Sequence, residues 1–246
     1  MKRVVIIPAK RHSSFENKNI RMLLGKPLIQ YTIWAALDSN AEEIIVSTDY
    51  SATARIAKEN GCTVHERDPS LCLDHTTSDE VIENVLEFLY KRDKSYPEQF
   101  IYMQVTDVIR PLNAVNNLCN MMDRYDIDSA FFSYATHKHY WNFQNDILVD
   151  INPNPKVARQ QGLSIYREDT GIGCITKTET FLKEGTRVCG KKGMVVNDDP
   201  MSMIDIHTQE DLDLAAFVIH SDIAKAKDYK YYHEYSFNEK TRWQKT

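Results

Sequence analysis

Short apolar runs alternate with helical patterns along the first 136 residues of this 246-residue chain, and this order limits the folds that it can adopt. The runs expected to form strands are 4–7, 44–46, 62–64, 100–104 and 129–133, with helical patterns near 28–39, 51–60, 78–92 and 113–124 between them. Such an order predicts an α/β fold with a Rossmann-like, mainly parallel sheet covered by helices on both faces. Right-handed crossovers would bring the carboxyl ends of the strands, and with them a ligand, to one edge of the sheet.

The rhythm changes after residue 136. Residues 137–172 are polar and carry turn signals at 152–155, so we expect a small inserted hairpin-like region there. The α/β pattern resumes at 173–176 and ends with a helix near 208–220. We therefore expect a core formed by residues 1–136 and 173–222, and a C-terminal tail over 223–246 with no recognisable function.

Composition narrows the class of protein. With 42% hydrophobic and 26% charged residues the chain is long enough for one large domain, and its net charge of −5 offers no broad basic surface for nucleic acid. The five cysteines show neither zinc-ligand spacing nor an even count for a disulfide framework. The chain has no secretory signal pattern and no run near the roughly 18 apolar residues that a membrane helix needs. We expect a cytoplasmic protein that binds neither nucleic acid nor membrane.

A basic loop follows the first expected strand. The β-branched run 4–7 ends at Pro8, and the loop after it contains Lys10, Arg11 and Lys18 together with His12 and two serines. A strand, a cationic loop and then a helix is a common place to hold a nucleotide triphosphate, because its oxygens require positive charge and N–H donors. The ordinary alternative is a solvated surface loop, and the loop by itself does not exclude it.

The motifs around this loop resemble those of the acylneuraminate cytidylyltransferase family, which includes the CMP-sialic, CMP-legionaminic and CMP-pseudaminic acid synthetases. Retained are Ile7-Pro8-Ala9, Ser13, Lys18-Asn19-Ile20 and Gly25-Lys26-Pro27-Leu28. The loop departs from the family pattern at four positions. Lys10 stands where the family has Arg, and Arg11 and His12 replace the paired glycines of the family. Ser14 stands where the family has its phosphate-binding Lys. Arg11 or Lys18 could supply the missing cation.

The resemblance covers roughly residues 1–220 and implies further nucleotide contacts. It extends to Ser47-Thr48-Asp49, to the segment from Arg67 to Ser78, and loosely to Gln104-Val105-Thr106-Asp107 with Arg110. In the family the matching Arg, Ser and Gln face the nucleotide. Each also has an ordinary explanation. Arg67 could pair with Glu66 or Asp68 on the surface, and Ser78 could cap the helix that follows. Gln104, at the end of a buried strand, needs a polar partner.

A second group of motifs implies an acceptor site. Arg159-Gln160-Gln161, followed by Tyr166-Arg167-Glu168-Asp169-Thr170-Gly171, is similar to the family region that binds the sugar acid and forms the dimer contact. The acceptor-binding set is then Gln104, Lys156, Arg159, Gln160 and Tyr166. Arg159 would bind the acceptor carboxylate, because a guanidinium offers paired donors. An exposed hairpin with ordinary charges is the alternative.

The third match concerns a metal. The family has two Asp residues at i and i+2, which would share one face of a strand and reach one Mg²⁺. Here Asp205 keeps the first position and His207 replaces the second. Imidazole is a poor ligand for Mg²⁺, so His207 would contact phosphate or favour Mn²⁺. Asp198 and Asp199 are a reserve site, and Thr208 with Asp211 also fits a helix-capping box.

The resemblance implies an enzyme that transfers CMP from CTP to a nine-carbon, sialic-acid-like sugar acid and releases pyrophosphate, as a homodimer, for surface polysaccharide biosynthesis. The expected catalytic residues are Lys10, Arg11, Lys18 and Asp205. The expected nucleotide contacts are Pro8, Ala9, Lys10, Ser13, Asn19, Arg67, Ser78 and Gln104. The sequence leaves open a different acidic acceptor, such as an octulosonic acid or a phosphonate, and a catalytically silent nucleotide-binding homologue. It identifies no general base.

Overall fold

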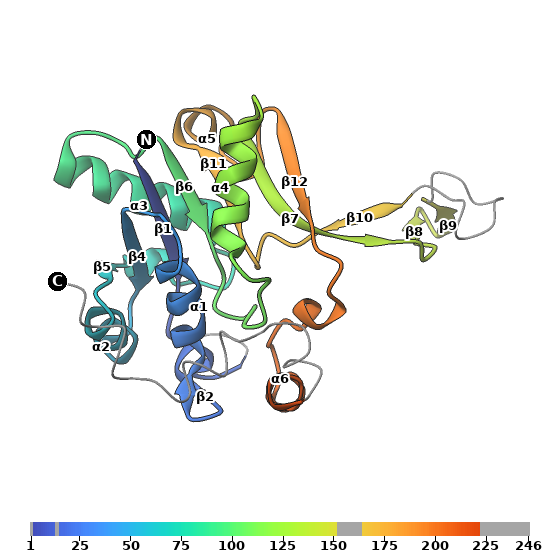
Figure 1. The fold of residues 1–246 in the computed structure, drawn as a ribbon, viewed down its shortest axis with the longest axis horizontal. Coiled ribbons are helices and arrows are strands. Elements are labelled where there is room, and N and C mark those ends of the chain that lie inside the picture. Colours follow the sequence, from blue (N-terminus) through green and yellow to red (C-terminus); the bar gives the residue numbers. More distant parts are fainter. Residues whose placement is uncertain (1, 13–14, 152–163, 222–246) are drawn as a thin grey trace.

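The computed structural model describes residues 2–12, 15–151 and 164–221. An eight-stranded sheet forms its centre, with the order β10-β7-β11-β6-β1-β4-β5 and with β12 paired to β7 (Figure 1). The strands are β1 (Arg3–Pro8), β4 (Glu43–Thr48), β5 (Thr63–Glu66), β6 (Gln99–Tyr102), β7 (Ser129–Thr136), β10 (Ile165–Glu168), β11 (Cys174–Lys177) and β12 (Lys192–Val196). The α/β fold predicted from the sequence is confirmed.

The sheet is parallel where the sequence pattern is regular. β1 pairs in parallel with both β4 and β6, and β4 pairs in parallel with β5. β11 inserts antiparallel between β6 and β7, and β10 pairs antiparallel with β7. The sequence analysis placed residues 165–168 in the inserted region, but β10 extends the main sheet. Its short, half-polar pattern is typical of an edge strand, which explains why it resembled a surface excursion.

Helices flank both faces. They are α1 (Leu28–Leu37), α2 (Ser51–Glu59), α3 (Ser78–Asp93), α4 (Ala114–Arg124), α5 (Thr178–Glu184) and α6 (Gln209–His220). Short elements complete the chain: η1 (Lys18–Ile20), β2 (Met22–Leu23), β3 (Lys26–Pro27), η2 (Pro69–Leu71) and η4 (Pro200–Met203). The predicted elements agree within a few residues, although the strand expected to reach residue 104 ends at Tyr102. No helix in the described ranges is long and apolar enough to span a bilayer.

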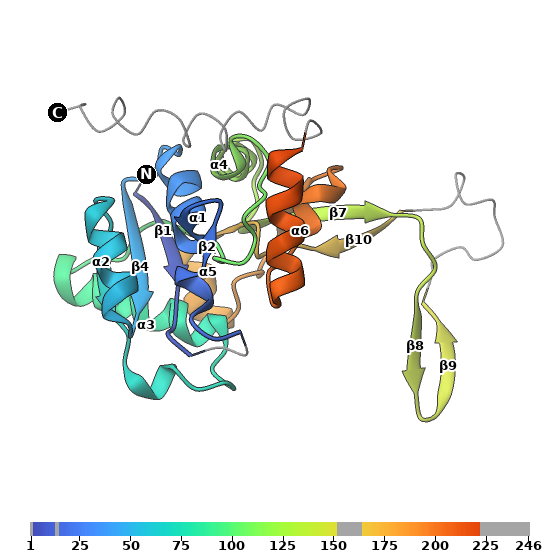
Figure 2. The same cartoon turned by 90° about the horizontal axis from the view of Figure 1, so that it is seen from below.

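Two cores lie on opposite faces of the sheet. Val5 and Ile7 of β1 pack with residues of α1, α2, α4 and α6, whereas Val4 and Ile6 pack with residues of α3 and α5 (Figure 2). All four side chains are fully buried. A strand buried on both faces needs a continuous apolar run rather than alternation, which is the pattern that the sequence showed.

A β-hairpin projects from the end of β7. It consists of β8 (Trp141–Gln144) and β9 (Ile147–Asp150), which pair antiparallel around Asn145 and Asp146. Both turn residues have positive φ, as a two-residue hairpin turn of this kind requires. Figures 1 and 2 show the hairpin standing away from the main body.

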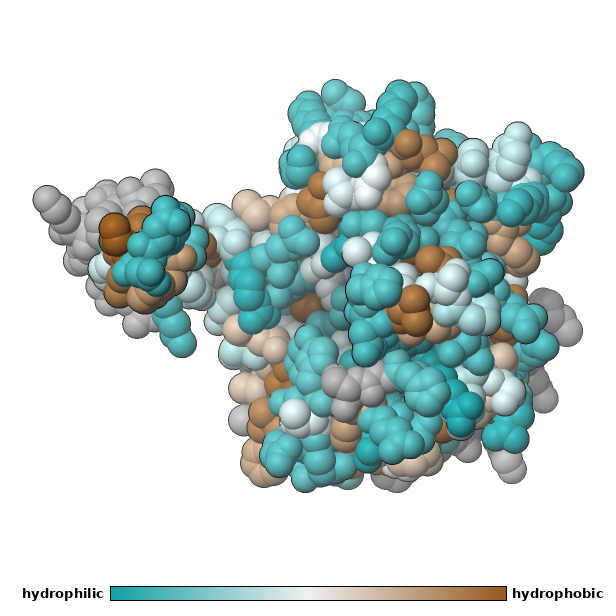
Figure 3. All heavy atoms as spheres, turned by 180° about the vertical axis from the view of Figure 1, so that it is seen from behind, coloured by the Kyte–Doolittle hydropathy of each residue, from teal (hydrophilic) through white to brown (hydrophobic). Residues whose placement is uncertain are grey.

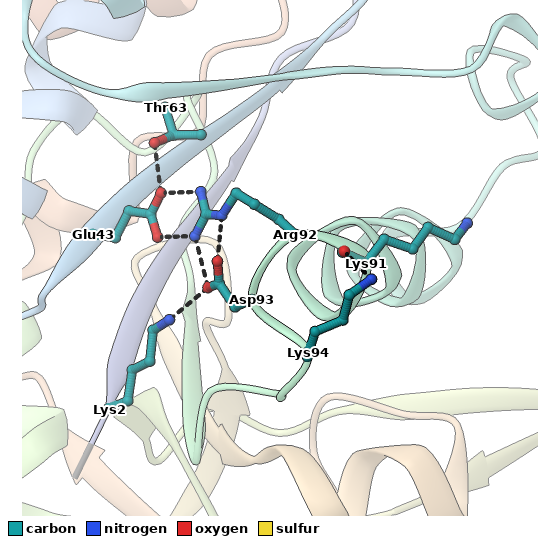
Figure 4. A network of polar contacts seen from close by, with 7 residues as sticks. All are labelled: Lys2, Glu43, Thr63, Lys91, Arg92, Asp93 and Lys94. Atoms are coloured by element: carbon teal, nitrogen blue, oxygen red, sulfur yellow. Dashed lines mark hydrogen bonds and ion pairs between the residues drawn. The ribbon is translucent and has the colours of Figure 1, made fainter.

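A polar network ties the end of α3 to the edge of the sheet (Figure 4). Arg92 binds both carboxylate oxygens of Glu43, at 2.6 and 2.7 Å, and Lys2 binds Asp93 at 2.7 Å. Thr63 donates a further hydrogen bond to Glu43. Because these groups are partly solvated, the network orients α3 against β4 and β5 more than it stabilises the fold.

Phe181 provides a test of the second core. Its ring packs edge-on against Phe100 at 5.1 Å and is 2% exposed. We expect Phe181→Ala to lower the free energy of unfolding by about 3–5 kcal/mol, because it leaves a cavity under β6 and β11. Leu182→Ala, at the exposed neighbouring position, is the matched control and should change stability by less than about 0.5 kcal/mol. Urea titration measures both, and equal losses would contradict this packing.

Candidate active site

A cavity of about 210 Å³ opens at the carboxyl ends of β1 and β6. Its lining comes from the first loop, the segment before α3 and the loop after β6: Pro8, Lys10, Lys18, Asn19, Arg67, Thr76, Thr77, Ser78, Val81, Tyr102, Gln104, Val105 and Thr106. Seven residues singled out from the sequence meet here: Pro8, Lys10, Lys18, Asn19, Arg67, Ser78 and Gln104. The parallel strands bring together residues that are up to 96 positions apart in the chain, from Pro8 to Gln104.

Two lysines line one side of this pocket. Lys10 binds the backbone oxygen of Leu73 at 3.1 Å and the carboxylate of Asp74 at 3.0 Å. Asn19 donates to the backbone oxygen of Lys10 at 2.7 Å and so holds the first loop in place. Burial lowers the pKa of Lys18, and the charges of Asp205 and Asp107 oppose that shift. The pocket therefore concentrates positive charge in a partly dehydrated setting, where charge acts more strongly than in water.

Arg67 forms part of the pocket wall and is only 4% exposed. Its Nε donates to Ser47 Oγ at 3.1 Å and its Nη2 donates to the backbone oxygen of Ser47 at 2.8 Å. Among the described residues no ion pair to Arg67 is present, so the surface pairing with Glu66 or Asp68 considered from the sequence is wrong. Burial lowers its pKa. A buried guanidinium without a carboxylate partner is suited to an acidic or acceptor-rich ligand.

The start of α3 corrects the capping alternative for Ser78. Thr77 is the N-cap: it accepts a hydrogen bond from the N–H of Glu80 at 3.2 Å, and Glu80 reciprocates at 2.6 Å. A capping box needs an acidic residue three positions after the cap. Glu80 has this position relative to Thr77, so the side chain of Ser78 is not used as the cap. Ser78 Oγ instead lies 2.7 Å from the hydroxyl of Tyr102. Tyr102 is a pocket residue that the sequence analysis missed, because it lies within an apolar strand.

Arg110 anchors the loop that follows β6. Its guanidinium donates to the backbone oxygens of Ile172 at 2.9 Å and Gly171 at 3.3 Å, to that of Gln104, and to Thr32 Oγ1 at 3.1 Å. The amide of Gln104 also donates to Gly171 at 3.0 Å. These bonds hold the backbone of Gln104, so Arg110 has a structural part. The side chain of Gln104 has the polar partner expected at the end of the buried strand in Thr106, whose Oγ1 donates to Gln104 Oε1 at 3.3 Å.

Asp107 is a second residue that the sequence analysis did not single out. It is 8% exposed, and burial raises its pKa to about 7. Arg110 and Thr106 oppose the shift, whereas the carboxylates of Asp205 and Asp169 add to it. A Cβ at Gly171 would come within 2.2 Å of its carboxylate, so the position requires glycine. The available signal was an acidic residue in a polar loop directly after a buried strand.

Asp205 and His207 meet, although not as the sequence predicted. Residues 204–207 form no strand, so the shared strand face expected for positions i and i+2 is wrong. One backbone bond, from Ile206 N–H to Thr106 at 3.2 Å, is too little pairing for a strand. His207 Nε2 lies 2.8 Å from Asp205 Oδ2, with both side chains about half exposed. The capping box of Thr208 and Asp211 is confirmed.

The oxygen donors near this edge do not form a preformed metal cage. Within residues 2–12, 15–151 and 164–221, no group of three or more His, Cys, Asp or Glu is arranged to hold an ion. The reserve residue Asp199 accepts from the backbone of Met201 at 3.0 Å as the cap of η4, and Asp198 is exposed. Asp205, like Asp107, lies near enough to Lys18 for its charge to oppose the lowering of the pKa of Lys18.

Other expected site residues do not line the pocket. Arg11 is exposed, with its guanidinium 4.9 Å from the centre of the Tyr50 ring. Ala9 is buried and donates its N–H to Ser47 at 2.8 Å. Tyr166 lies on β10 and is 44% exposed. Four further predicted residues lie outside the described ranges: Ser13, Lys156, Arg159 and Gln160.

Comparison with known proteins identifies the family of this chain. The family model described as Cytidylyltransferase matches residues 4–242. The chain belongs to the cytidylyltransferase family. An N-acylneuraminate cytidylyltransferase of Streptococcus agalactiae is 30% identical over 192 residues, which is 75% of this chain and 45% of that protein. The chain therefore spans about half the length of that relative.

Two further comparisons extend over most of this chain. A pseudaminic acid cytidylyltransferase of Campylobacter jejuni is 25% identical over 244 residues, covering 96% of this chain and all of that protein. The solved structure of a CMP:2-keto-3-deoxy-manno-octonic acid synthetase complexed with CTP aligns with a TM-score of 0.64 at 16% identity. It covers 89% of this chain and 98% of that one, and at this identity it supports the fold alone.

The raised pKa of Asp107 predicts a pH dependence of stability. The unfolded carboxyl loses its proton near pH 3.8, whereas the folded one keeps it to about pH 7. The contribution of Asp107 to the free energy of unfolding is therefore fully present below about pH 4 and is lost as the pH rises through about 7. We expect Asp107→Asn to gain stability over the parent between these values, by on the order of 4 kcal/mol at most. Asp146→Asn, on the exposed hairpin turn, is the control. If the difference in the free energy of unfolding between the parent and Asp107→Asn, measured by urea titration, stays the same across this pH range, the assignment is refuted.

Proposed function

We propose that this cytidylyltransferase-family chain transfers CMP from CTP to a sialic-acid-like sugar acid with release of pyrophosphate. The observation that carries the proposal is the pocket at the carboxyl ends of β1 and β6. There Lys10 and Lys18 meet a buried guanidinium, Arg67, that has no carboxylate partner among the described residues. This location is where α/β proteins bind nucleotides. The relatives are named as cytidylyltransferases, which supports cytosine as the base of the nucleotide.

The chemistry follows from the charge that the reaction moves. A hydroxyl oxygen of the acceptor attacks the α-phosphorus in line and a new P–O bond forms. The bond to the pyrophosphate oxygen breaks, and the hydroxyl proton passes to water. Negative charge grows on the leaving pyrophosphate, and Lys10 and Lys18 would stabilise it in a partly dehydrated pocket. Arg67, Asn19, Ser78 and Gln104 would orient the nucleotide, because preorganised donors contribute by fixing the reacting geometry.

We propose Mg²⁺ as the cofactor, with Mn²⁺ as an alternative. Mg²⁺ is commonly held by one or two carboxylates together with substrate phosphates and waters, so Asp205 fits without a preformed cage. Because His207 Nε2 already engages one oxygen of Asp205, His207 would orient this carboxylate rather than bind the metal itself. The ion would neutralise charge on the phosphates.

The chemical identity of the acceptor is the most specific part of the proposal. Relatives named for neuraminic and pseudaminic acid favour a nine-carbon sugar acid. Arg159, Lys156, Gln160 and Tyr166 would bind its carboxylate and hydroxyl groups, with a second copy of the chain nearby. An octulosonic acid or a phosphonate is the second candidate, and a phosphonate would favour the additional Arg11 and His12 of the first loop. All five cysteines are free thiols, which suits a reducing, cytoplasmic compartment.

The direct test is pyrophosphate release with Mg²⁺ and each of four nucleoside triphosphates, against sialic, legionaminic, pseudaminic and octulosonic acids and simple phosphonates. We expect release with CTP and one sugar acid. Lys18→Met should lower kcat by about 100-fold, because it removes a cation facing the leaving group. Lys58→Met, on the exposed face of α2, is the control and should keep full activity.

The possible results separate the candidates. Release with an octulosonic acid or phosphonate alone would replace the proposed acceptor. CTP binding without release across the whole panel would favour a silent nucleotide-binding homologue. Release with another triphosphate and none with CTP would overturn the assignment of the base.

We also propose that the β8–β9 hairpin joins two copies of the chain. Four apolar side chains on it are more than half exposed: Trp141 (55%), Phe143 (68%), Ile147 (65%) and Leu148 (54%). Figure 3 shows hydrophobic atoms on the lobe that projects from the main body. Apolar side chains gathered on one small projection usually become covered by a partner. A second copy of the chain is the occupant that the family resemblance implies.

Paired substitutions test this interface. We expect Phe143→Asp with Leu148→Asp to convert a dimer into a monomer in light scattering at micromolar concentration, because charge cannot be buried there without a partner. Phe217→Asp changes an equally exposed aromatic residue on α6 and should leave the dimer intact. A monomeric parent protein would refute the proposal.

A further inference from the structure

Three buried side chains form a continuous hydrogen-bonded chain behind the pocket wall. Arg67 Nε lies 3.1 Å from Ser47 Oγ, and Ser47 Oγ lies 3.1 Å from His65 Nδ1. Ser47 and His65 are paired residues on the adjacent parallel strands β4 and β5. Their exposed fractions are 0% for Ser47, 4% for Arg67 and 5% for His65. Only Arg67 of the three lines the pocket.

The direction of these hydrogen bonds follows from donor chemistry. A guanidinium only donates, so Ser47 Oγ accepts from Arg67. The hydroxyl proton of Ser47 then needs an acceptor, since a buried donor left unpaired is costly. His65 Nδ1 is within reach and meets that need when it carries no proton. Burial and the neighbouring charge of Arg67 lower the pKa of His65 to about 4, which keeps the ring neutral near neutral pH.

The backbone of Ser47 completes the arrangement. Its carbonyl oxygen accepts from Nη2 of Arg67 at 2.8 Å and from the N–H of Ala9 at 2.8 Å. One edge of the guanidinium, made by Nε and Nη2, is therefore held by a single residue at the carboxyl end of β4. The N–H groups of Nη1 are left for a ligand, because no described residue accepts from them.

We propose that His65 is a positioning residue for the nucleotide: through the hydroxyl of Ser47 it fixes the rotation of the Arg67 guanidinium that faces the pocket. The inference rests on the proposed function, because it takes Arg67 as a nucleotide contact. Without an acceptor at His65, the Ser47 hydroxyl would no longer have a fixed direction. Only the bond from Nη2 to the Ser47 carbonyl would then fix the edge that directs Nη1. The cost would appear in nucleotide binding, since preorganised donors lose less entropy on binding.

A purely structural part for His65 is the alternative, because its ring also packs against Phe88 at 5.1 Å. In that case the ring contributes only to the packing of β5 against α3. The two explanations differ in what a loss of stability does to nucleotide affinity. Phe88→Leu disturbs the same packing and leaves the hydrogen-bonded chain intact, so it is the matched control.

The experiment measures the Kd for CTP by calorimetry, together with thermal unfolding, in five variants. We expect Ser47→Ala to weaken CTP about 10-fold and His65→Phe about 5-fold, as for one hydrogen bond to a charged and a neutral group. His65→Asn, whose side-chain oxygen can accept near Nδ1, should restore affinity to within about twofold. The double variant His65→Phe with Ser47→Ala should bind no more weakly than Ser47→Ala alone. Phe88→Leu should unfold at a lower temperature with unchanged Kd.

Nitrogen-15 NMR of the histidine ring provides a readout that needs no ligand. We expect His65 to carry its proton on Nε2, with Nδ1 unprotonated, and to lose this preference in Ser47→Ala. A proton on Nδ1, fully additive effects in the double variant, or equal loss of affinity in Phe88→Leu would each overturn the inference. Failure of the parent protein to bind CTP would instead refute the proposed function, and the NMR result would still decide the direction of the hydrogen bonds.

Discussion

Parallel pairing of β1 with β4 and β6 is the constraint on which the rest of this molecule depends. It aligns the carboxyl ends of the three strands, so the first loop, the Ser47 region and the loop after Tyr102 begin at one edge of the sheet. Each strand is apolar and buried on both faces along its middle and presents polar side chains only at its two ends. The pocket is therefore the place where the chain leaves its core, and polar groups collect there because the core excludes them.

Buried charge gives this edge its chemical character. Arg67 and Lys18 are cations whose charge is disfavoured by burial, and Asp107 is a carboxyl whose pKa is raised for the same reason. Such groups reduce the stability of the empty protein, and a charged ligand would relieve the cost. Lys18 and Arg67 line the cavity, and ionisable groups with perturbed pKa values in a cavity are characteristic of functional sites. Arg110, by contrast, satisfies its charge with backbone oxygens and acts as a structural anchor.

Sequence reasoning succeeded where local chemistry decides and failed where two distant segments must meet. The apolar run of β1 and the capping box of α6 were predicted from neighbouring residues alone. The alternative explanation of Ser78 as a helix cap was wrong by one position, because Glu80 forms the capping box with Thr77. Tyr102 was missed because nothing beside it in the chain distinguishes a pocket residue from a core residue. Asp107 was not singled out, although it is an acidic residue in the loop after a buried strand. β10 was placed in an excursion because its pairing with β7 depends on a partner about 30 positions away.

The sequence by itself determined the α/β class, the strand and helix order and the cationic loop after the first strand, since each depends on side-chain periodicity within a few residues. The tertiary structure decided that Arg67 is buried rather than paired on the surface, that Ser47 and His65 stand behind it, and that Asp205 meets His207 outside any strand. Hydrogen bonding and dehydration depend on which side chains come within a few ångströms of each other. For Ser47 and His65 that proximity is set by the pairing of β4 with β5.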